Sequence, residues 1–306
     1  MKTNKLIISD KDASLRLDKL LPLYFPEHSR SYFQFLIEKG HVRVNGAQLK
    51  KRMKTKVGDE IEIEFLALPE LSVDQEEIPL EILFEDDHVL AINKPAGMVV
   101  HPGAGNPSKT FANALMFHCK NLKKEDFDPL RPGIVHRLDK ETSGVLIAAK
   151  TYEAHQNLVK QFSERKVKKT YLAICVGNLE PGIISAPIQR HPIHRKEMAI
   201  SPAGKESITH VKVLGSHNGT CLVEAEPITG RTHQIRVHLK HRGAPVLGDF
   251  LYGSDKANSH FDAKRQYLHA HRLKFKHPTL EKILELKAPI PADMKEFISK
   301  NFYNII

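Results

Sequence analysis

Apolar positions recur at helical spacing in two short segments near the start of the chain. In "RLDKLLPLYF" the apolar positions Leu17, Leu20, Leu21 and Tyr24 lie on one face, and Pro26 ends the segment. "HSRSYFQFLIEKG" has a candidate helix cap at Ser29 and a helix stop at Gly40. The alternating runs "HVRVNG" and "DEIEIEF" follow. This pattern predicts two helices and then a small hairpin.

The rest of the chain alternates between strand patterns and one clear helix. Residues 208–227 form two alternating runs joined by Asn218-Gly219, which is a strong hairpin signal. The segment 151–162 has apolar residues four positions apart and predicts an amphipathic helix. The expected strands are 88–94, 144–150, 168–177, 208–217, 220–227 and 271–278. The fold class expected is therefore α+β with a mostly antiparallel sheet.

The segment "HRLKFKHP" has one apolar and one cationic face. Leu273 and Phe275 share the apolar face, and Arg272, Lys274 and Lys276 share the other. A strand of this kind suits a sheet that lines a nucleic-acid groove. His269 and His271 share a face as well, and we expect them to be core or RNA-facing residues.

Charge divides the chain into parts. The 306 residues carry a formal net charge of +10 and a pI of about 9.3, which favours an anionic partner such as nucleic acid. Residues 1–56 contain 13 Lys and Arg against 5 Asp and Glu, whereas residues 57–78 contain 8 acidic residues and no basic one. We therefore expect a basic module at 1–66 with the run "KKRMKTK" (50–56) at its edge, an acidic linker at 67–79 and a larger domain at 80–306.

The cysteines and the amino-terminal sequence bear on where the protein works. Cys119, Cys175 and Cys221 are far apart and form no C-x-x-C motif, so we expect small buried side chains rather than disulfides or zinc ligands. The amino terminus has no apolar core of a signal peptide, and no apolar run approaches the length of a membrane span. The expectation is a cytoplasmic protein without membrane contact. No segment suggests a subunit interface, so a monomer is expected.

Several familiar kinds of enzyme are not supported by the sequence. "HPGAGNP" is too short and too rich in proline for a nucleotide-binding loop. His233, His238 and His241 lie close together, but they do not form a metal-binding motif and have no nearby carboxylate. No G-x-S-x-G motif or Cys/His pair indicates acyl transfer. We expect no metal and no cofactor.

One carboxylate stands out in "GIVHRLDKETSGVLIAAK". Asp139 lies between Arg137 and Lys140, immediately before an apolar strand pattern, and Gly144 permits a tight turn there. Two interpretations are open: a structural salt bridge, or an ionised nucleophile in a poorly solvated site. In the second case we expect the guanidinium of Arg231, in "TGRTHQIRVHL", to face Asp139.

Taken together, "GIVHRLDKETSGVLIAAK", "KTYLA", "TGRTHQIRVHL" and "LGDFLYG" resemble the RluA-type pseudouridine synthases. The first module, with "SRSYFQFLIEKGHVRVNG", resembles the S4 RNA-binding domain. The resemblance covers nearly the whole chain. It implies a pseudouridine synthase fold and an enzyme that isomerises uridine in RNA without cofactor, metal or redox step. It is nearest to members that act on large-subunit (23S) ribosomal RNA.

The resemblance also implies roles for individual residues. Asp139 is the nucleophile, Tyr171 stacks on the target uracil and serves as a candidate base, and Arg231 pairs with Asp139. Arg137 fills the gap that the flipped nucleotide leaves, and Ile235 adds to the apolar wall around the base. The remaining expected RNA contacts are His136, Lys140 and Arg236 in the larger domain and Arg30 and Lys39 in the S4-like module.

Other functions remain possible on the sequence alone. The same family modifies tRNA, so a tRNA uridine is the second candidate substrate, and an assembling ribosomal subunit is a possible partner. A non-catalytic RNA-binding factor on the same scaffold would not need Asp139, Tyr171 and Arg231 together. A carboxylate-dependent nucleoside hydrolase would need a second acid or a metal cluster.

Overall fold

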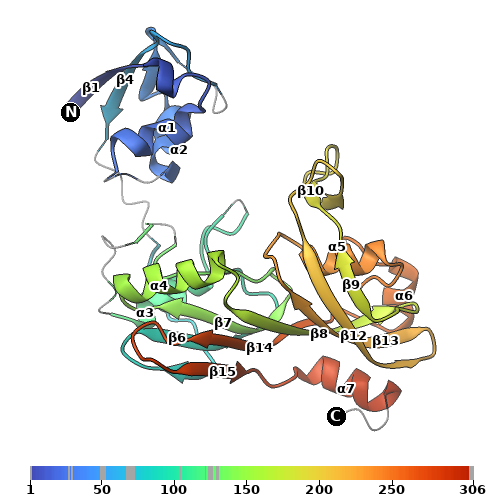
Figure 1. Cartoon of the computed structure of the whole chain (residues 1–306). Helices are drawn as coiled ribbons and strands as arrows, with labels where there is room; N and C mark the ends of the chain where they lie inside the picture. The colour runs from blue at the N-terminus through green and yellow to red at the C-terminus, as the bar shows by residue number, and fades with distance from the viewer. Residues whose placement is uncertain are drawn as a thin grey trace. The chain divides into compact units, whose positions relative to one another are not determined.

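The computed structural model divides the chain into two compact units, Met1–Leu71 and Ser72–Ile306. It describes residues 2–26, 28, 30–48, 53–66, 73–103, 105–120, 122, 127–128 and 131–302. Figure 1 shows the elements of both units. Each unit has its own hydrophobic core and is described by itself.

The first unit packs two helices on a four-stranded sheet. Its elements are β1 (Lys2–Ile7), the short 3-10 helix η1 (Asp10–Asp12), α1 (Leu17–Tyr24), α2 (Arg30–Lys39), β2 (Val42–Val44), β3 (Ala47–Gln48) and β4 (Glu60–Phe65). The sheet order is β1-β4-β2-β3, and the pairs are antiparallel. The predicted helix–helix–hairpin pattern is confirmed, whereas strand β1 was not predicted.

Local sequence explains the turns of this unit. Asn45 and Gly46 both have positive φ, of 51° and 75°, and join β2 to β3. Asn and Gly tolerate this left-handed conformation at low cost, so "NG" specifies the hairpin. Gly40, with φ of 79°, ends α2 as expected. The candidate cap Ser29 and residues 50–52 of the basic run lie outside the described residues.

The second unit is built on a nine-stranded sheet in the order β5-β6-β7-β14-β8-β13-β12-β9, with β15 paired to β14. The strands are β5 (Ile82–Glu85), β6 (Val89–Lys94), β7 (Ser143–Ala149), β8 (Lys168–Val176), β9 (Gly182–Ser185), β12 (Ile208–His217), β13 (Thr220–Pro227), β14 (Leu268–Lys276) and β15 (Ile283–Lys287). The β7–β14 pair is parallel and the other pairs are antiparallel. The expected α+β class with a mostly antiparallel sheet is confirmed.

Helices cover both faces of this sheet. They are α3 (Phe111–His118), α4 (Tyr152–Ser163), α5 (Gln234–His241), α6 (Asp255–His260) and α7 (Ala292–Asn301). Alternate residues of β6 and β7 pack on α3 and on α4, while alternate residues of β8 pack on α5 and on α7. Figure 1 shows α4 and α5 on the side of the sheet opposite α7. Burial on both faces explains why β7 and the centre of β8 are continuous apolar runs.

Part of the expected acidic linker belongs to the second unit. Val73 is buried in the core beneath α3, and the side chain of Asn113 donates to the backbone oxygen of Asp74 at 2.9 Å. The backbone nitrogen of Glu76 donates to the oxygen of Asn113 at 3.2 Å. Residues 73–76 are therefore anchored along α3, and residues 67–72 lie outside the described part of the chain.

The cations of the β14 face that was expected to line a nucleic-acid groove are paired with carboxylates. Arg272 pairs at 2.7 Å with Glu224 of β13, a strand that β8 separates from β14. Lys276 pairs with Glu281 at 2.6 Å. Lys274 lies 3.8 Å from Glu285 on β15. Carboxylates of neighbouring segments thus neutralise these cations, and a single-strand pattern cannot show such partners. His269 and His271 are buried in the core.

Candidate active site

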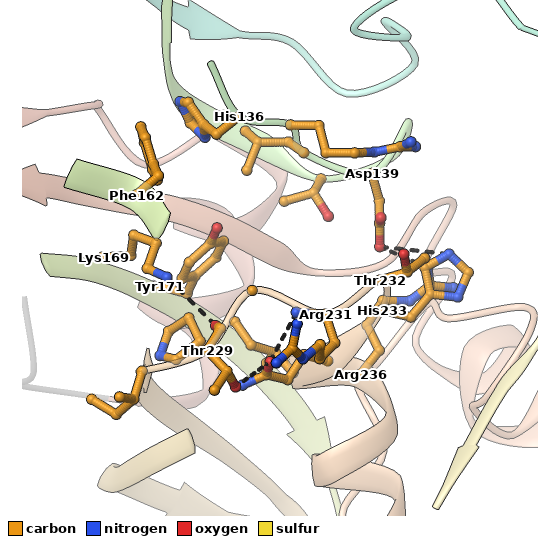
Figure 2. Close-up of a pocket in the computed structure, with 18 of the residues that line it drawn as sticks. His136, Asp139, Phe162, Lys169, Tyr171, Thr229, Arg231, Thr232, His233 and Arg236 are labelled. Carbon is orange, nitrogen blue, oxygen red and sulfur yellow. Dashed lines mark hydrogen bonds and ion pairs between the residues drawn. The ribbon is translucent and has the colours of Figure 1, made fainter. Parts of the chain in front are cut away.

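A cavity of about 480 Å³ opens between the loop before β7, the end of α4, the start of β8, the loop between β13 and α5, and the first turn of α5. The loop before β7 contributes Asp139, β8 contributes Tyr171, the loop after β13 contributes Arg231 and α5 contributes Arg236. Figure 2 shows these side chains around one space. The fold thus brings the three predicted catalytic residues to one cavity.

Asp139 is held by a buried guanidinium. Nη1 of Arg236 donates to Oδ2 of Asp139 at 2.9 Å. The same guanidinium binds Asp249 through two bonds, from Nε to Oδ2 at 2.7 Å and from Nη2 to Oδ1 at 2.9 Å. Asp249 is fully buried, and its Oδ1 also accepts from the backbone nitrogens of Leu251 and Tyr252. Asp249 therefore fixes the guanidinium that stabilises the charge of Asp139.

The expected pairing of Arg231 with Asp139 is wrong. Nε of Arg231 donates instead to the backbone oxygen of Glu206 at 3.0 Å. Arg236, which we expected to face RNA, is buried and occupies the place assigned to Arg231. The backbone between them turns through a left-handed residue, His233, before α5 begins. Two arginines five positions apart cannot be ranked from sequence when such a turn separates them.

The turn after Asp139 is tight, as Gly144 suggested, and hydrogen bonds of Thr142 close it. The backbone nitrogen of Thr142 donates to the oxygen of Asp139 at 3.1 Å, and Nε2 of Gln266 donates to the hydroxyl of Thr142 at 2.6 Å. Gly144 has φ of 114°, and a Cβ there would lie 2.2 Å from the oxygen of Ala270. Only glycine lets β7 pair with β14 at this point.

The side chain of Lys94 also stabilises this turn, and the sequence analysis did not identify Lys94. Its side chain is fully buried, and Nζ donates to the backbone oxygens of Pro95 at 2.7 Å, Met98 at 2.9 Å and Lys140 at 3.0 Å. Burial lowers the pKa of Lys94 to about 7, against the charges of Glu141 and Asp139, which raise it. The available signal was a lysine inside the apolar run "VLAINKPAG".

Tyr171 lies in the cavity as a neutral phenol. It occupies β8 opposite Ala225 of β13 and Ala270 of β14, so its position is set by the middle of the sheet. Burial raises the pKa of Tyr171 above its usual range, and the charge of Asp139 raises it further. A phenol that keeps its proton is suited to stacking. It is poorly suited to act as a base in its resting state.

The four remaining residues of this unit that were predicted to contact the RNA differ in burial and in whether they line the cavity. Arg137 is exposed at the cavity, and its side chain has no hydrogen-bond partner within the described part of the chain; Ile235 is buried in the cavity wall. Lys140 is exposed but does not line the cavity.

His136 is a structural residue as well as a lining one, because its Nε2 accepts from the backbone nitrogen of Ile147 at 3.0 Å and its ring stacks on Phe162. Burial and the charge of Lys169 lower its pKa to about 3, so the imidazole is neutral.

Lys169 is a second lysine that sequence reasoning missed. It is half-buried in the cavity wall, with Nζ 3.5 Å from the backbone oxygen of Thr229. Among the residues that the structure describes, no carboxylate pairs with it. Burial and, to a smaller extent, the charge of Arg165 together lower its pKa to about 8. Its place two residues before Tyr171 in "KKTYLA" was the only signal.

In the first unit, Arg30 is organised by a buried acid. Asp18 is fully buried and accepts from Arg30 at 2.6 Å, from Arg16 at 2.9 Å and from Gln34 at 2.7 Å. Burial would raise the pKa of Asp18, but the hydrogen bonds from Gln34, Arg30 and Arg16 outweigh it and lower the pKa to about 2. Arg30 remains about half exposed, and Lys39 is exposed at the end of α2.

Metal ligands and membrane segments give no further site. Glu85, His118 and Cys119 bring their ligand atoms within 4.8 Å of one another. Glu85 is already paired with Lys150 at 2.8 Å and with His118 at 2.9 Å, and the ammonium group opposes binding of a cation. All three cysteines are buried and free, as expected. In the part of the chain that the structure covers, no helix has both the length and the apolar character to cross a bilayer.

Comparisons with known proteins agree with this site. The family model for RNA pseudouridylate synthase matches residues 88–241, and the S4 domain model matches residues 15–61. Ribosomal large subunit pseudouridine synthase D of Nitrosomonas europaea is 45% identical over 299 residues, which is 95% of this chain and 86% of the relative. The protein of the same name from Xanthomonas campestris is 40% identical over 96% of this chain and 91% of the relative.

A further relative and a solved structure extend the comparison. The uncharacterized RNA pseudouridine synthase YlyB of Bacillus subtilis is 41% identical over 95% of both chains. The structure of human RNA pseudouridylate synthase domain containing 4 superposes with a TM-score of 0.57 at 29% identity, over 72% of this chain and 92% of that one. These matches span the cavity as well as the fold. The chain therefore belongs to the RNA pseudouridylate synthase family, and its enzymatic class is that of the pseudouridine synthases.

Proposed function

We propose that this protein isomerises uridine to pseudouridine in large-subunit ribosomal RNA, with Asp139 as the nucleophile. One observation carries the assignment of Asp139: it is the only carboxylate that lines the cavity within the described residues, and it lies against a guanidinium. A nucleoside hydrolase would need a second acid or a metal there. A binding factor would gain nothing from an ionised carboxylate facing an anionic ligand.

The chemistry follows from this single carboxylate. Asp139 attacks the target nucleoside, the bond between uracil N1 and ribose C1′ breaks, and the base turns. C5 then bonds to C1′, the bond between Asp139 and the nucleoside breaks, C5 loses its proton and N1 gains one, so that the product is an isomer of the substrate and the carboxylate is regenerated. Nucleophilic catalysis divides this exchange into two steps, and Arg236 holds the carboxylate in an ion pair before the first.

Recognition of the base requires that the uridine leave its stack. Extrusion costs a few kcal/mol, and a stacking partner in the pocket offsets part of this cost. The neutral phenol of Tyr171 is the aromatic group positioned to stack, with the apolar side chain of Ile235 in the same cavity. Arg137, exposed and without a hydrogen-bond partner in the described chain, is assigned to the space that the base vacates.

The cationic groups of the cavity are assigned to the RNA backbone. Lys169 has no carboxylate partner among the described residues, and an ammonium group of this kind in a half-buried site favours an anion. We assign it to a phosphate next to the target uridine. In the first unit, Arg30 and Lys39 are assigned to phosphates elsewhere on the RNA, because both are basic side chains exposed at the surface.

The choice of large-subunit RNA rests on the relatives. Those from Nitrosomonas europaea and Xanthomonas campestris carry that substrate in their names, whereas the Bacillus subtilis relative of similar identity does not. A tRNA uridine is therefore the second candidate. Action on an assembling subunit, a monomeric state and a cytoplasmic location stay predictions.

The decisive experiment maps pseudouridine in RNA from cells that lack this protein. Carbodiimide modification and primer extension should show stops in large-subunit RNA after incubation with the wild-type enzyme, and none after incubation with Asp139→Asn. Asp262→Asn is the matched control, because Asp262 is exposed and does not line the cavity. If stops are restored only in tRNA, the substrate assignment fails. If both Asp139→Asn and wild type restore them, Asp139 is not the nucleophile.

A further inference from the structure

His233 is the second side chain, after Arg236, that brings a polar atom close to the carboxylate of Asp139. Its Nε2 is 3.9 Å from Oδ2 of Asp139. The residue has φ of 57° and ψ of 19°, a left-handed conformation that is uncommon for residues other than glycine and in which His, Asn and Asp are enriched. It precedes the first turn of α5, and this conformation directs the imidazole into the cavity (Figure 2).

A short chain of hydrogen bonds determines which ring nitrogen carries the proton. The hydroxyl of Tyr252 accepts from the backbone nitrogen of Met198 at 2.7 Å and lies 2.8 Å from Nδ1 of His233. We assign the hydroxyl proton to Nδ1, because Nδ1 is the only acceptor that this hydroxyl contacts among the described residues. His233 then carries its proton on Nε2, the nitrogen that faces Asp139.

The protonation states of both groups support this chain. Burial raises the pKa of Tyr252 to about 12, so the phenol keeps the proton that it donates. Burial also lowers the pKa of His233, against the charge of Asp139, which raises it, and the ring is therefore neutral at physiological pH. A neutral ring has one proton, and the Tyr252 bond directs it to Nε2.

The two oxygens of Asp139 are not equivalent. Arg236 and His233 both approach Oδ2, at 2.9 Å and 3.9 Å. In the described part of the chain no side chain donates to Oδ1. A carboxylate held through one oxygen presents the other to the substrate in a defined direction, which is the geometry that a nucleophile requires.

Resting on the proposed function, we infer that His233, set in its Nε2–H tautomer by Tyr252, is a positioning residue that together with Arg236 holds Oδ2 of Asp139 and leaves Oδ1 as the attacking oxygen. The 3.9 Å separation closes to hydrogen-bond distance when the substrate enters, as contacts in active sites tighten in the reactive complex. Met198 and Tyr252 act through His233 and do not touch the substrate.

The test uses two substitutions that differ only in where they place an amide. Asn tolerates the left-handed backbone but its side chain is too short to replace Nε2, whereas the amide of Gln reaches that place. His233→Asn should lower the single-turnover rate on saturating RNA by roughly 10- to 100-fold, the loss of one hydrogen bond to a charged group. His233→Gln should recover most of this loss. The dissociation constant for RNA should change less than about threefold, because the bond acts on the nucleophile.

Controls separate positioning from folding. His241→Asn changes an exposed histidine at the other end of α5 and should retain the wild-type rate. Tyr252→Phe keeps the ring beneath Arg236 but removes the hydroxyl, so it should lower the rate by less than His233→Asn does. Thermal unfolding of each variant shows whether the fold is kept. Equal rates for wild type and His233→Asn, or equal losses for the Asn and Gln variants when both are folded, would overturn the inference.

A spectroscopic measurement does not depend on turnover. Nitrogen-15 NMR of the imidazoles should show His233 as the Nε2–H tautomer in wild type and a mixture of tautomers in Tyr252→Phe. A wild-type ring protonated on Nδ1 would overturn the inference even if the enzyme is active. If wild type makes no pseudouridine on any RNA, the proposed function fails, and the NMR result still decides the tautomer.

Discussion

At the scale of residues, the site depends on which charged side chains form ion pairs with one another. One guanidinium, Arg236, serves two carboxylates, Asp139 and Asp249, so the three groups together keep a negative charge in the cavity wall. Planar geometry allows this, because Arg236 donates three hydrogen bonds in one plane, two of them to Asp249. Lysine at position 236 could not hold both carboxylates. The charge left on Asp139 is what the proposed attack uses.

Lys169 should contribute one phosphate contact. Replacing it with Met removes the charge, and the slope of log affinity against log salt concentration should become shallower by about 0.7. Only the ammonium form of Lys169 attracts phosphate, and the pKa of Lys169 in the protein without RNA is about 8. The wild-type affinity should therefore fall as pH rises from 8 to 10, whereas that of Lys169→Met should stay level. Fluorescence anisotropy with a short RNA measures both.

The matched control is the neighbouring lysine. Lys168 is exposed and pairs with Glu226 at 3.0 Å, so Lys168→Met should leave the salt slope and the pH dependence as they are in wild type. A wild-type affinity that is independent of pH over this range would mean that Lys169 does not face a phosphate.

At the scale of elements, two loops depend on one buried side chain. The turn at 95–98 follows β6 and the turn at 139–142 precedes β7, and Lys94 donates to carbonyl groups in both. The backbone nitrogen of Gly97 also donates to the oxygen of Lys140 at 2.9 Å. The position of Asp139 is thus coupled to the end of an adjacent strand, rather than being a property of its own loop.

Lys94→Met should destabilise the second unit by about 3 kcal/mol, because the carbonyl groups of Pro95 and Met98 lose the donor Nζ and that of Lys140 loses one of its two donors. The folded-state pKa of Lys94 is about 7 and the ordinary value is 10.5, so the unfolded chain binds more protons between these values. The free energy of unfolding of wild type should therefore rise from pH 7 to pH 10 relative to that of Lys94→Met. Urea unfolding at several pH values measures this difference.

Lys140→Met is the control for that series. It removes a charge from the same turn, but the bond to Lys94 uses the backbone oxygen of Lys140 and is kept. Its stability should stay within about 0.5 kcal/mol of wild type, as is usual for exposed positions. A Lys94→Met protein as stable as this control would show that the buried bonds are dispensable.

At the scale of the whole molecule, the cavity and the basic excess of the amino-terminal residues belong to two different units with separate cores. The cavity and every group that faces it lie in the second unit. The first unit carries the basic excess of residues 1–56 and the half-exposed Arg30. Affinity for RNA and catalysis should therefore be separable by truncation.

A chain that begins at Ser72 should bind RNA more weakly, with a shallower dependence on salt, because phosphate contacts are lost. Its single-turnover rate at saturating RNA should stay within a few fold of wild type, since all residues of the cavity remain. Binding is measured by anisotropy over a series of salt concentrations, and the rate by pseudouridine mapping. An unchanged salt slope would mean that the first unit does not read phosphates.

The sequence by itself determined several of the elements and singled out Asp139 as the candidate reacting group. Periodicity is local, so the helices at 17–24 and 30–39, the Asn218-Gly219 hairpin and the buried strand after Asp139 could be predicted from neighbouring residues. The glycine of "HRLDKETSG" indicated a tight turn, and Gly144 indeed meets the backbone of β14. These features need no knowledge of distant segments.

The tertiary structure alone decided which partners those residues meet. The bond between Arg236 and Asp139 joins residues 97 positions apart, and no rule of spacing selects Arg236 over Arg231. The same reason hid Lys94, whose acceptors include a carbonyl 46 positions away, and the glutamates that neutralise the cationic face of β14. Periodicity shows which way a side chain points along its own element. An ion pair or a buried hydrogen bond is decided by what another element places opposite, and that depends on the packing of the whole sheet.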